Sequence, residues 1–135
     1  MRRTPLKRTE SLARQPMRRT RPRPTIPAAL RAQLVERSGG WCEARLPGCT
    51  GRATDACHRV TRGMGGRLDD GYLSNLWHGC RTCHRWTHDR PTEANELGLM
   101  LENWQDPRQE PMAYQSAGMV LLQDDGGLWP FGDAA

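Results

Sequence analysis

The spacing of four cysteines constrains the fold of this chain more than any other feature of its sequence. Six residues separate Cys42 from Cys49, and two residues separate Cys80 from Cys83, a CxxC spacing that is typical of metal sites. Four thiolates around one zinc ion make a closed tetrahedral site, which serves structure rather than catalysis. We therefore predict that Cys42, Cys49, Cys80 and Cys83 bind a structural Zn²⁺, which supplies part of the folding free energy.

The composition explains why this chain would need a metal to fold. Only 36% of its 135 residues are apolar, and its mean hydropathy is −0.79. A small polar chain buries little apolar surface, and such domains often fold around a metal ion. Five cysteines are an odd number, which argues against a complete disulfide framework. The alternative, given the wide spacing of the first pair, is that Cys42 and Cys49 are ordinary buried thiols.

The charges are spread unevenly along the chain. Residues 1–24 hold nine basic residues against one acidic residue, residues 25–90 hold ten against six, and residues 91–135 hold one against eight. A basic arm joined to a mildly basic middle fits a polyanionic partner, most simply nucleic acid. A solvated tail and an acidic protein partner are the alternatives. The sequence has neither a run of 18 apolar residues nor a signal-peptide core, which predicts a cytoplasmic protein without membrane contact.

The pattern along the chain predicts an α+β fold with three parts. Residues 1–26 are rich in proline and arginine, so we expect a disordered basic arm. Residues 27–104 form the metal-stabilised domain, with helices at about 27–38 and 91–98, each begun by a proline and ended by glycine. Residues 105–135 form a C-terminal extension, with a β-hairpin around the turn at 124–127. Four residues are expected to cover the metal-binding core: Leu97, Met100, Leu101 and Trp104.

A second group of chemically versatile residues lies between the cysteine pairs and just after them. His84 and His88 are four residues apart, so on a helix they lie on one face and can share a metal. Cys57 and His58 are adjacent, so in an extended segment one can bind a metal while the other faces a substrate. Asn75 can fix the orientation of an imidazole or of a backbone group. Metal ligands beside a histidine that does not bind the metal are the arrangement expected for metal-assisted hydrolysis.

A less specific reading of the same residues stays open. His84 and His88 could replace cysteines in the structural zinc site, and His58 could be a solvated loop residue.

Together these motifs resemble the HNH endonuclease family, in particular its small phage and prophage members with a zinc-binding cysteine quartet. The resemblance covers about residues 41–104 and is specific as a set, although no single motif is. The matching segments are Cys42-Glu, Pro47-Gly-Cys49, Cys57-His58-Arg59, Arg62-Gly-Met-Gly-Gly66, Ser74-Asn75-Leu76, Cys80-Arg-Thr-Cys83-His84 and His88.

The resemblance implies a ββα-metal fold, in which a two-stranded hairpin is followed by a helix and a metal lies between them. Cys57-His58 would end the first strand, Asn75 would lie before or at the start of the second, and the helix would carry His84 and His88. The resemblance makes His58 the general base that activates water and Asn75 the residue that orients it. His84 and His88 would bind the catalytic divalent metal, which could be Mg²⁺, Mn²⁺, Ni²⁺ or Zn²⁺.

Cys57 departs from the family pattern. The family usually has a histidine or aspartate ligand at this position, and a thiolate there would bind zinc but disfavour Mg²⁺. Either the site uses a softer metal together with Cys57, or Cys57 is not a ligand and water replaces it.

The resemblance implies double-stranded DNA as the substrate and a phage protein in the cytoplasm of a bacterial host, acting beside a terminase in DNA packaging. Arg59, Arg62 and Arg85 are candidates for contacts with DNA phosphates, because a guanidinium matches phosphate geometry. A monomer would nick one strand, and a weak dimer could cut both. The alternative function is a non-catalytic zinc-binding adaptor for nucleic acid or protein; Cys57 favours the adaptor, and His58 with Asn75 favours the nuclease.

Overall fold

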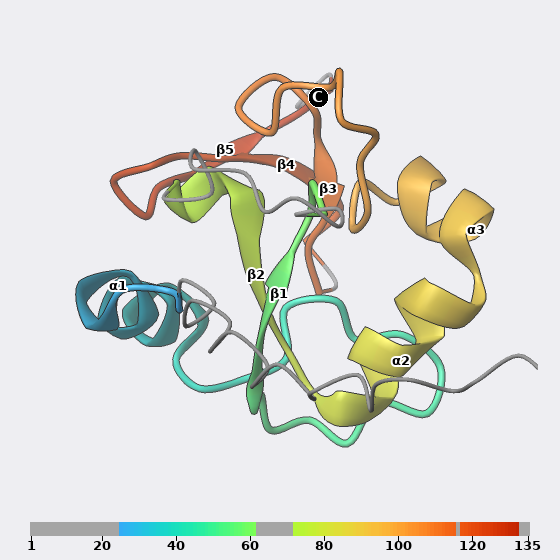
Figure 1. Ribbon diagram of the computed structural model, residues 1–135, viewed down its shortest axis with the longest axis horizontal. Coiled ribbons are helices and arrows are strands. Elements are labelled where there is room, and N and C mark those ends of the chain that lie inside the picture. Colours follow the sequence, from blue (N-terminus) through green and yellow to red (C-terminus); the bar gives the residue numbers. More distant parts are fainter. Residues whose placement is uncertain (1–24, 62–71, 116, 133–135) are drawn as a thin grey trace, which may run out of the picture.

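The computed structural model describes residues 25–61, 72–115 and 117–132, which form a small α+β domain with two small sheets. Most of the expected basic arm and Arg62 therefore lie outside the described residues. Figure 1 shows a central hairpin of β1 and β2, with the three-stranded sheet across one end. The elements are α1 (Ala28–Ser38), β1 (Asp55–His58), the 3-10 turn η1 (Leu73–Asn75), β2 (Leu76–Gly79), α2 (Arg81–Asp89), α3 (Pro91–Glu96), β3 (Met112–Ala113), β4 (Met119–Leu122) and β5 (Leu128–Pro130).

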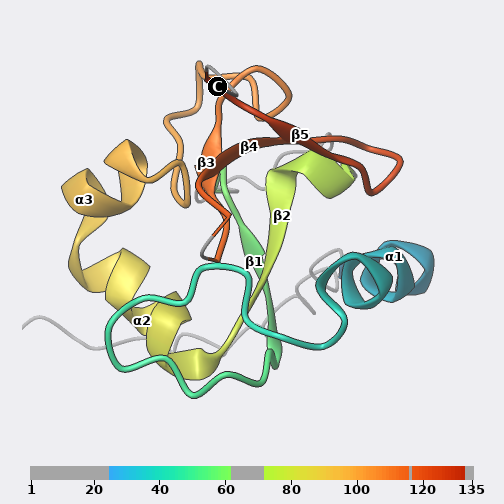
Figure 2. The same ribbon diagram turned by 180° about the vertical axis from the view of Figure 1, so that it is seen from behind.

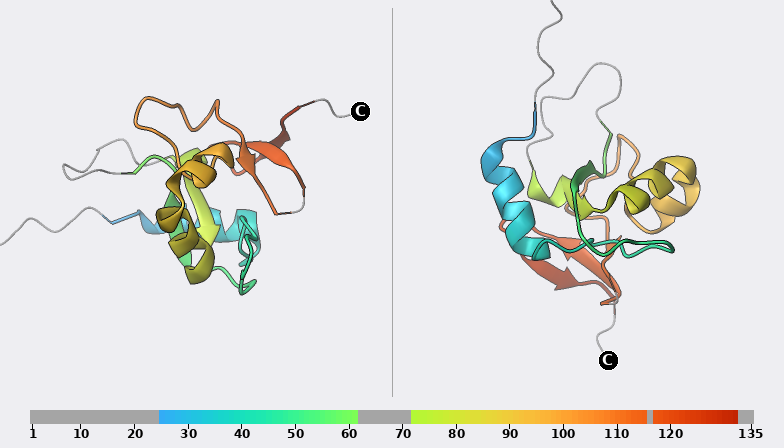
Figure 3. Two further views of the ribbon diagram at one scale, coloured as in Figure 1. Left: turned by 90° about the vertical axis from the view of Figure 1, so that its right-hand side faces the viewer. Right: turned by 90° about the horizontal axis from the view of Figure 1, so that it is seen from below.

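The first helix begins and ends where the sequence predicts. Pro27 precedes α1, and Gly39 ends it in the left-handed conformation, with φ of 62°, which glycine adopts without steric cost. Leu34 points inward and packs with Leu73 and Leu76 in a small apolar cluster. This cluster attaches α1 to one face of the central hairpin, while α2 and α3 lie on the other side (Figure 3).

The central hairpin is antiparallel, with Cys57 opposite Trp77 and His58 opposite Leu76. Because side chains alternate along a strand, Asp55 and Cys57 share one face of β1 and His58 lies on the other. All four residues of β2 are buried, as expected for a strand covered on both faces.

The main core lies between the hairpin, the cysteine-bearing loop and the C-terminal sheet. Trp77 is fully buried, and its indole Nε1 donates a hydrogen bond to the Leu99 carbonyl at 3.1 Å. Met112, Val120 and Leu122 come from the segment that we expected to be an extension, and they pack into this same core. Figure 2 shows the β3–β5 sheet lying across the end of the hairpin. Strands β4 and β5 form the predicted C-terminal hairpin.

The segment after α3 differs from the prediction at one residue. The helix ends at Glu96, and Gly98 turns the chain with φ of 68°, at a place where an added Cβ would collide with the Pro111 carbonyl. Leu101 is buried, as expected for a residue that covers the core. Trp104 is 78% exposed, so the expectation that it covers the core is wrong.

Arg59 has a different position from the one expected of a DNA contact. Its side chain is completely buried, and its nitrogens donate to five main-chain carbonyls. Nε bonds the Gly98 carbonyl at 2.7 Å, and the other acceptors are the carbonyls of Ser74, Pro107, Glu110 and Pro111. Burial lowers the pKa of this guanidinium to about 10. With its donors engaged, Arg59 links β1 to the 98–111 segment and is not placed to bind phosphate.

Replacing Arg59 with methionine is therefore expected to destabilise the domain. The change leaves buried carbonyls without donors, each costing about 1–3 kcal/mol before the structure relaxes, so we expect a net loss of about 3–5 kcal/mol. Urea unfolding in the presence of Zn²⁺, with Arg85→Met as the surface control, measures the effect. A midpoint equal to that of the control would show that Arg59 does not stabilise the fold.

A second buried network joins α1 to the hairpin. Arg37 and Glu43 form an ion pair at 2.7 Å with side chains that are 1% and 0% exposed. Arg37 also donates to the carbonyls of Leu73 and Leu76, and Glu43 accepts the His78 backbone N–H at 2.7 Å. The charges are thus paired and hydrogen-bonded, as buried charges have to be.

Among the described residues, no helix is both long and apolar enough to cross a membrane.

Candidate metal centre

The structure brings the four predicted cysteines together. The sulfur atoms of Cys42, Cys49, Cys80 and Cys83 all lie within 4.8 Å of one another, and those of Cys49 and Cys80 are 3.9 Å apart. Sulfurs bound to one zinc ion at about 2.3 Å in a tetrahedron are about 3.8 Å apart. The quartet is therefore compatible with a structural metal such as zinc.

Two distant parts of the chain build this cluster. The loop between α1 and β1 supplies Cys42 and Cys49, and it runs beside the start of α2, where Cys80 and Cys83 lie (Figures 1 and 2). Cys80 is the N-cap of α2, and its sulfur accepts the backbone N–H of Cys83 at 3.4 Å. In the same way Cys49 accepts the N–H of Gly51 at 3.3 Å. Such bonds, and the positive end of the helix dipole, stabilise thiolates.

The thiols of the cluster differ in acidity when no metal ion is bound. Burial opposes ionisation of Cys80, but hydrogen bonds from the backbone of Cys83 and from Thr50 outweigh it and lower its pKa to about 6. Burial raises the pKa of Cys83 well above its usual range, and Cys42 beside it adds to the effect. Four thiolates at this separation repel one another unless a metal ion neutralises them.

The predicted histidine pair also comes together, on the exposed side of α2. The Nε2 atoms of His84 and His88 are 3.2 Å apart. Two imidazoles bound to one zinc ion at about 2.0–2.1 Å, near a tetrahedral angle, place their nitrogens about 3.3 Å apart. The two nitrogens are therefore spaced to bind one metal ion.

Asp55 sets the state of the first of these histidines. Its Oδ2 lies 2.8 Å from Nδ1 of His84, and its Oδ1 accepts from Thr54 Oγ1 at 2.9 Å. Burial opposes ionisation of Asp55, but hydrogen bonds from His84 and Thr54 outweigh it and lower its pKa. An ionised Asp55 accepts a hydrogen bond from the proton on Nδ1 of His84, and in the neutral form of that imidazole Nε2 then carries the lone pair that a metal ion needs. Carboxylates orient metal-binding histidines in this way in many proteins.

Cys57 does not join the histidines. Its side chain is 2% exposed and packs in the main core, and burial raises the pKa of its thiol. Histidine, cysteine, aspartate and glutamate side chains can bind a metal ion. Within the part of the chain that the structure describes, the cysteine quartet is the one group of three or more of them whose ligand atoms all lie within 4.8 Å of one another. Of the three predicted catalytic ligands, the structure thus assembles His84 and His88 and leaves Cys57 buried.

The remaining predicted site residues lie at the end of β1. His58 is half-buried at the last position of this strand. The side chain of Asn75 accepts the backbone N–H of Val60 through Oδ1 at 2.8 Å, and the backbone carbonyl of Asn75 accepts the N–H of Arg59. Asn75 thus fixes the backbone that follows His58. The sequence allowed Asn75 to orient either an imidazole or a backbone group, and these hydrogen bonds are to the backbone.

Two residues of this site were missed by the sequence interpretation. Asp55 lies two positions before Cys57, so the alternation of a strand would have placed it on the same face. Arg81 lies on α2 four residues before Arg85; both are exposed, and Arg81 lies 3.3 Å from Asp55. The spacing of the two arginines places them on one side of the helix.

No family model matches the chain, and no match was found among curated proteins or solved structures. The function therefore has to be inferred from the residues and their geometry.

Proposed function

We propose that this protein is a metal-dependent DNA endonuclease of the HNH type. The observation that carries the proposal is the pairing of His84 and His88 on α2, held by Asp55 of β1, within a β1–β2–α2 arrangement that also carries His58 at the strand end. An adaptor protein would need the cysteine quartet alone. It has no use for two converging imidazole nitrogens or for a carboxylate that fixes the tautomer of one of them.

The residues have separate roles in this proposal. His58 takes a proton from the attacking water, a task for which an imidazole is suited near neutral pH. Asn75 holds the backbone that follows His58 and so fixes where the imidazole points. A divalent cation bound by His84 and His88 would neutralise charge on the phosphate and on the departing oxygen. Two imidazoles favour Zn²⁺, Ni²⁺ or Mn²⁺ over Mg²⁺, which prefers oxygen ligands.

The cysteine quartet also stabilises the position of His84. Cys83 and His84 are adjacent in α2, so a zinc ion in the quartet fixes the helix turn from which His84 projects. The structural zinc would therefore position a catalytic ligand as well as stabilise the fold.

Contacts with double-stranded DNA would come from exposed basic residues. Arg81 and Arg85 of α2 lie beside the histidine pair, and the basic arm and Arg62 would add contacts that depend on salt rather than on sequence. A phage protein that acts with a terminase in the bacterial cytoplasm is the biological setting that the resemblance favours. With one site per chain, the monomer would nick DNA.

One observation favours a second candidate, the zinc-binding adaptor. Cys57 stands where the family has a third ligand, and it is buried in the core. Two histidines alone bind a metal less tightly than three ligands do.

The test is cleavage of supercoiled plasmid. Brief EDTA treatment should remove a metal held by two imidazoles before one held by four thiolates, and the zinc content is measured afterwards. We expect nicking to stop and to return when Mn²⁺, Ni²⁺ or Zn²⁺ is added. The protein for this test is folded and holds one zinc ion per chain. If it does not nick the plasmid with any added metal, including Mg²⁺, the adaptor becomes the better proposal.

Asp55 provides a more specific prediction. Replacing it with asparagine removes the carboxylate that holds the His84 proton on Nδ1, and loss of such a partner costs about 10–100-fold in metal affinity. Titration of the one-zinc protein with Ni²⁺ or Zn²⁺ against a coloured chelator measures this affinity. Asp89→Asn, at the exposed end of α2, is the matched control. Equal affinities for the two variants would remove Asp55 from the metal site.

A further inference from the structure

A cavity of about 310 Å³ lies beside Asn75, outside the metal centre. Its walls come from the start of η1 and from residues 103–108, and they include Tyr72, Asn103, Trp104, Gln105 and Arg108. Trp104 is 78% exposed and Tyr72 is 43% exposed, although both are large aromatic side chains. The cavity is open to solvent and combines aromatic rings with polar side chains, which suits the flat ring of a ligand that stays partly exposed.

The walls of the cavity are held in place from several sides. Arg59 donates to the Pro107 carbonyl at 2.8 Å, and the Gln105 amide oxygen accepts from the backbone of Glu102 at 2.7 Å and from Asn95 at 3.0 Å. These bonds fix the 103–108 segment although it has no regular secondary structure. The exposure of Trp104 is therefore a property of a fixed loop, which reduces the entropy lost when a ligand binds.

The charges of the cavity disfavour an anionic ligand. The Arg108 guanidinium lies 4.0 Å from the centre of the Tyr72 ring, and its Nε bonds Asp124 at 2.8 Å. Asp124 is fixed in turn by the backbone and hydroxyl of Ser74, at 3.1 and 2.7 Å. The arginine charge is thus already paired, and Asp106 adds a negative charge to the wall. A phosphate is repelled here, whereas an uncharged aromatic ring can stack.

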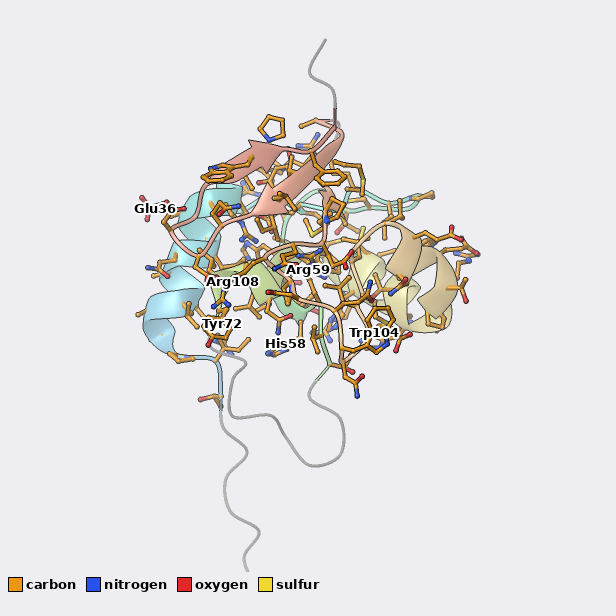
Figure 4. All side chains as sticks on the ribbon, turned by 90° about the horizontal axis from the view of Figure 1, so that it is seen from above. Glu36, His58, Arg59, Tyr72, Trp104 and Arg108 are labelled. Atoms are coloured by element: carbon orange, nitrogen blue, oxygen red, sulfur yellow. The ribbon has the colours of Figure 1, made fainter. Side chains whose placement is uncertain are left out.

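We propose that this cavity binds one unpaired nucleobase of a DNA strand, stacked on the exposed ring of Trp104. Aromatic side chains bind single-stranded bases in this way because every base has a π-face. Figure 4 shows Tyr72, His58 and Trp104 in a row along one edge of the domain. This inference rests on the proposed nuclease function, and it makes DNA with an unpaired base near the cut the preferred substrate.

The test is binding of labelled 12-nucleotide DNA to the full-length chain. His58→Ala is used as the background, so that any cleavage does not interfere, and fluorescence anisotropy reports affinity at fixed salt. Trp104→Ala is expected to weaken binding of the single strand about 5- to 100-fold, the range for loss of one stacked base. Trp129→Ala is the matched control, since Trp129 is also exposed, at 61%, but does not line the cavity.

Strands with an abasic position moved one nucleotide at a time identify what the cavity binds. At one particular abasic position, the difference in affinity between the Trp104 protein and the Trp104→Ala variant should largely disappear, because the base that would stack is absent. Equal affinity of the Trp104→Ala and Trp129→Ala variants would overturn the inference. Unchanged affinity of the Trp104 protein for every abasic strand would also overturn it, because an abasic nucleotide keeps its backbone and loses only its base. Because binding is measured without cleavage, failure of the nuclease proposal in the plasmid assay would be distinguishable from failure of the base site.

Discussion

Replacing Cys83 with serine is expected to abolish both zinc binding and the folded state. Cys83 is completely buried, and its sulfur belongs to the cluster that joins the loop between α1 and β1 to α2. A hydroxyl is a poor substitute for a thiolate ligand, and the other three sulfurs would then lie close together without a bound ion. Since metal binding contributes about 10–16 kcal/mol in small structural zinc sites, its loss exceeds the usual stability of a domain.

The matched control for this variant is Cys57→Ser. Cys57 is about as buried as Cys83 and lies in the same core, but it is outside the four-sulfur cluster. It should lose some stability through burial of a hydroxyl and still bind one zinc ion per chain. Metal analysis and near-ultraviolet circular dichroism separate the two variants. A soluble Cys83→Ser protein with a full zinc ion and native dichroism would show that the quartet is not the structural site.

Replacing His58 with alanine is expected to reduce plasmid cleavage by at least about 10²- to 10⁴-fold, the usual contribution of a general base. His58 is half-buried at the end of β1 and belongs to neither apolar cluster. The variant should therefore fold, bind zinc at the cysteine quartet and bind a metal ion at His84 and His88. The measurement is the initial nicking rate at saturating metal, together with the thermal midpoint and the metal content.

One control variant and the addition of metal make the His58 result specific. His88→Ala should also lose activity, but its activity should partly return at high metal concentration, because its defect is in metal binding. His58→Ala should not respond to added metal. Undiminished cleavage by a folded His58→Ala protein would remove His58 as the base and would direct attention to a metal-bound water without a protein base.

The sequence predicted much of the local structure because the signals were local. Pro27 precedes α1 and Gly39 ends it, as the sequence predicted. Strands β4 and β5 pair on either side of the predicted glycine-containing turn. The CxxC spacing predicted that Cys80 and Cys83 share a metal site, and the structure also brings the widely spaced Cys42 and Cys49 to them. The pairing of His84 and His88 followed from their spacing of four residues together with the helix that the family resemblance implied. The role of these residues in cleavage stays a prediction.

Tertiary structure decided the positions that depend on distant parts of the chain. Arg59 looks like a phosphate ligand beside His58, yet the 98–111 segment returns to it with four carbonyls, and Ser74 supplies a fifth. Trp104 looks like a core residue, yet the loop that carries it turns away after Leu101. Asp55, rather than Cys57, contacts His84, because α2 crosses β1 nearer to its start.

The cysteine sequence pattern thus indicated by itself which four thiols could share a structural metal, because the CxxC spacing is a property of neighbouring residues. Which arginine is buried, which tryptophan is exposed and which carboxylate orients His84 were decided only by the packing of segments far apart in sequence. Burial and hydrogen-bond partners are set by those long-range contacts, and no local pattern encodes them.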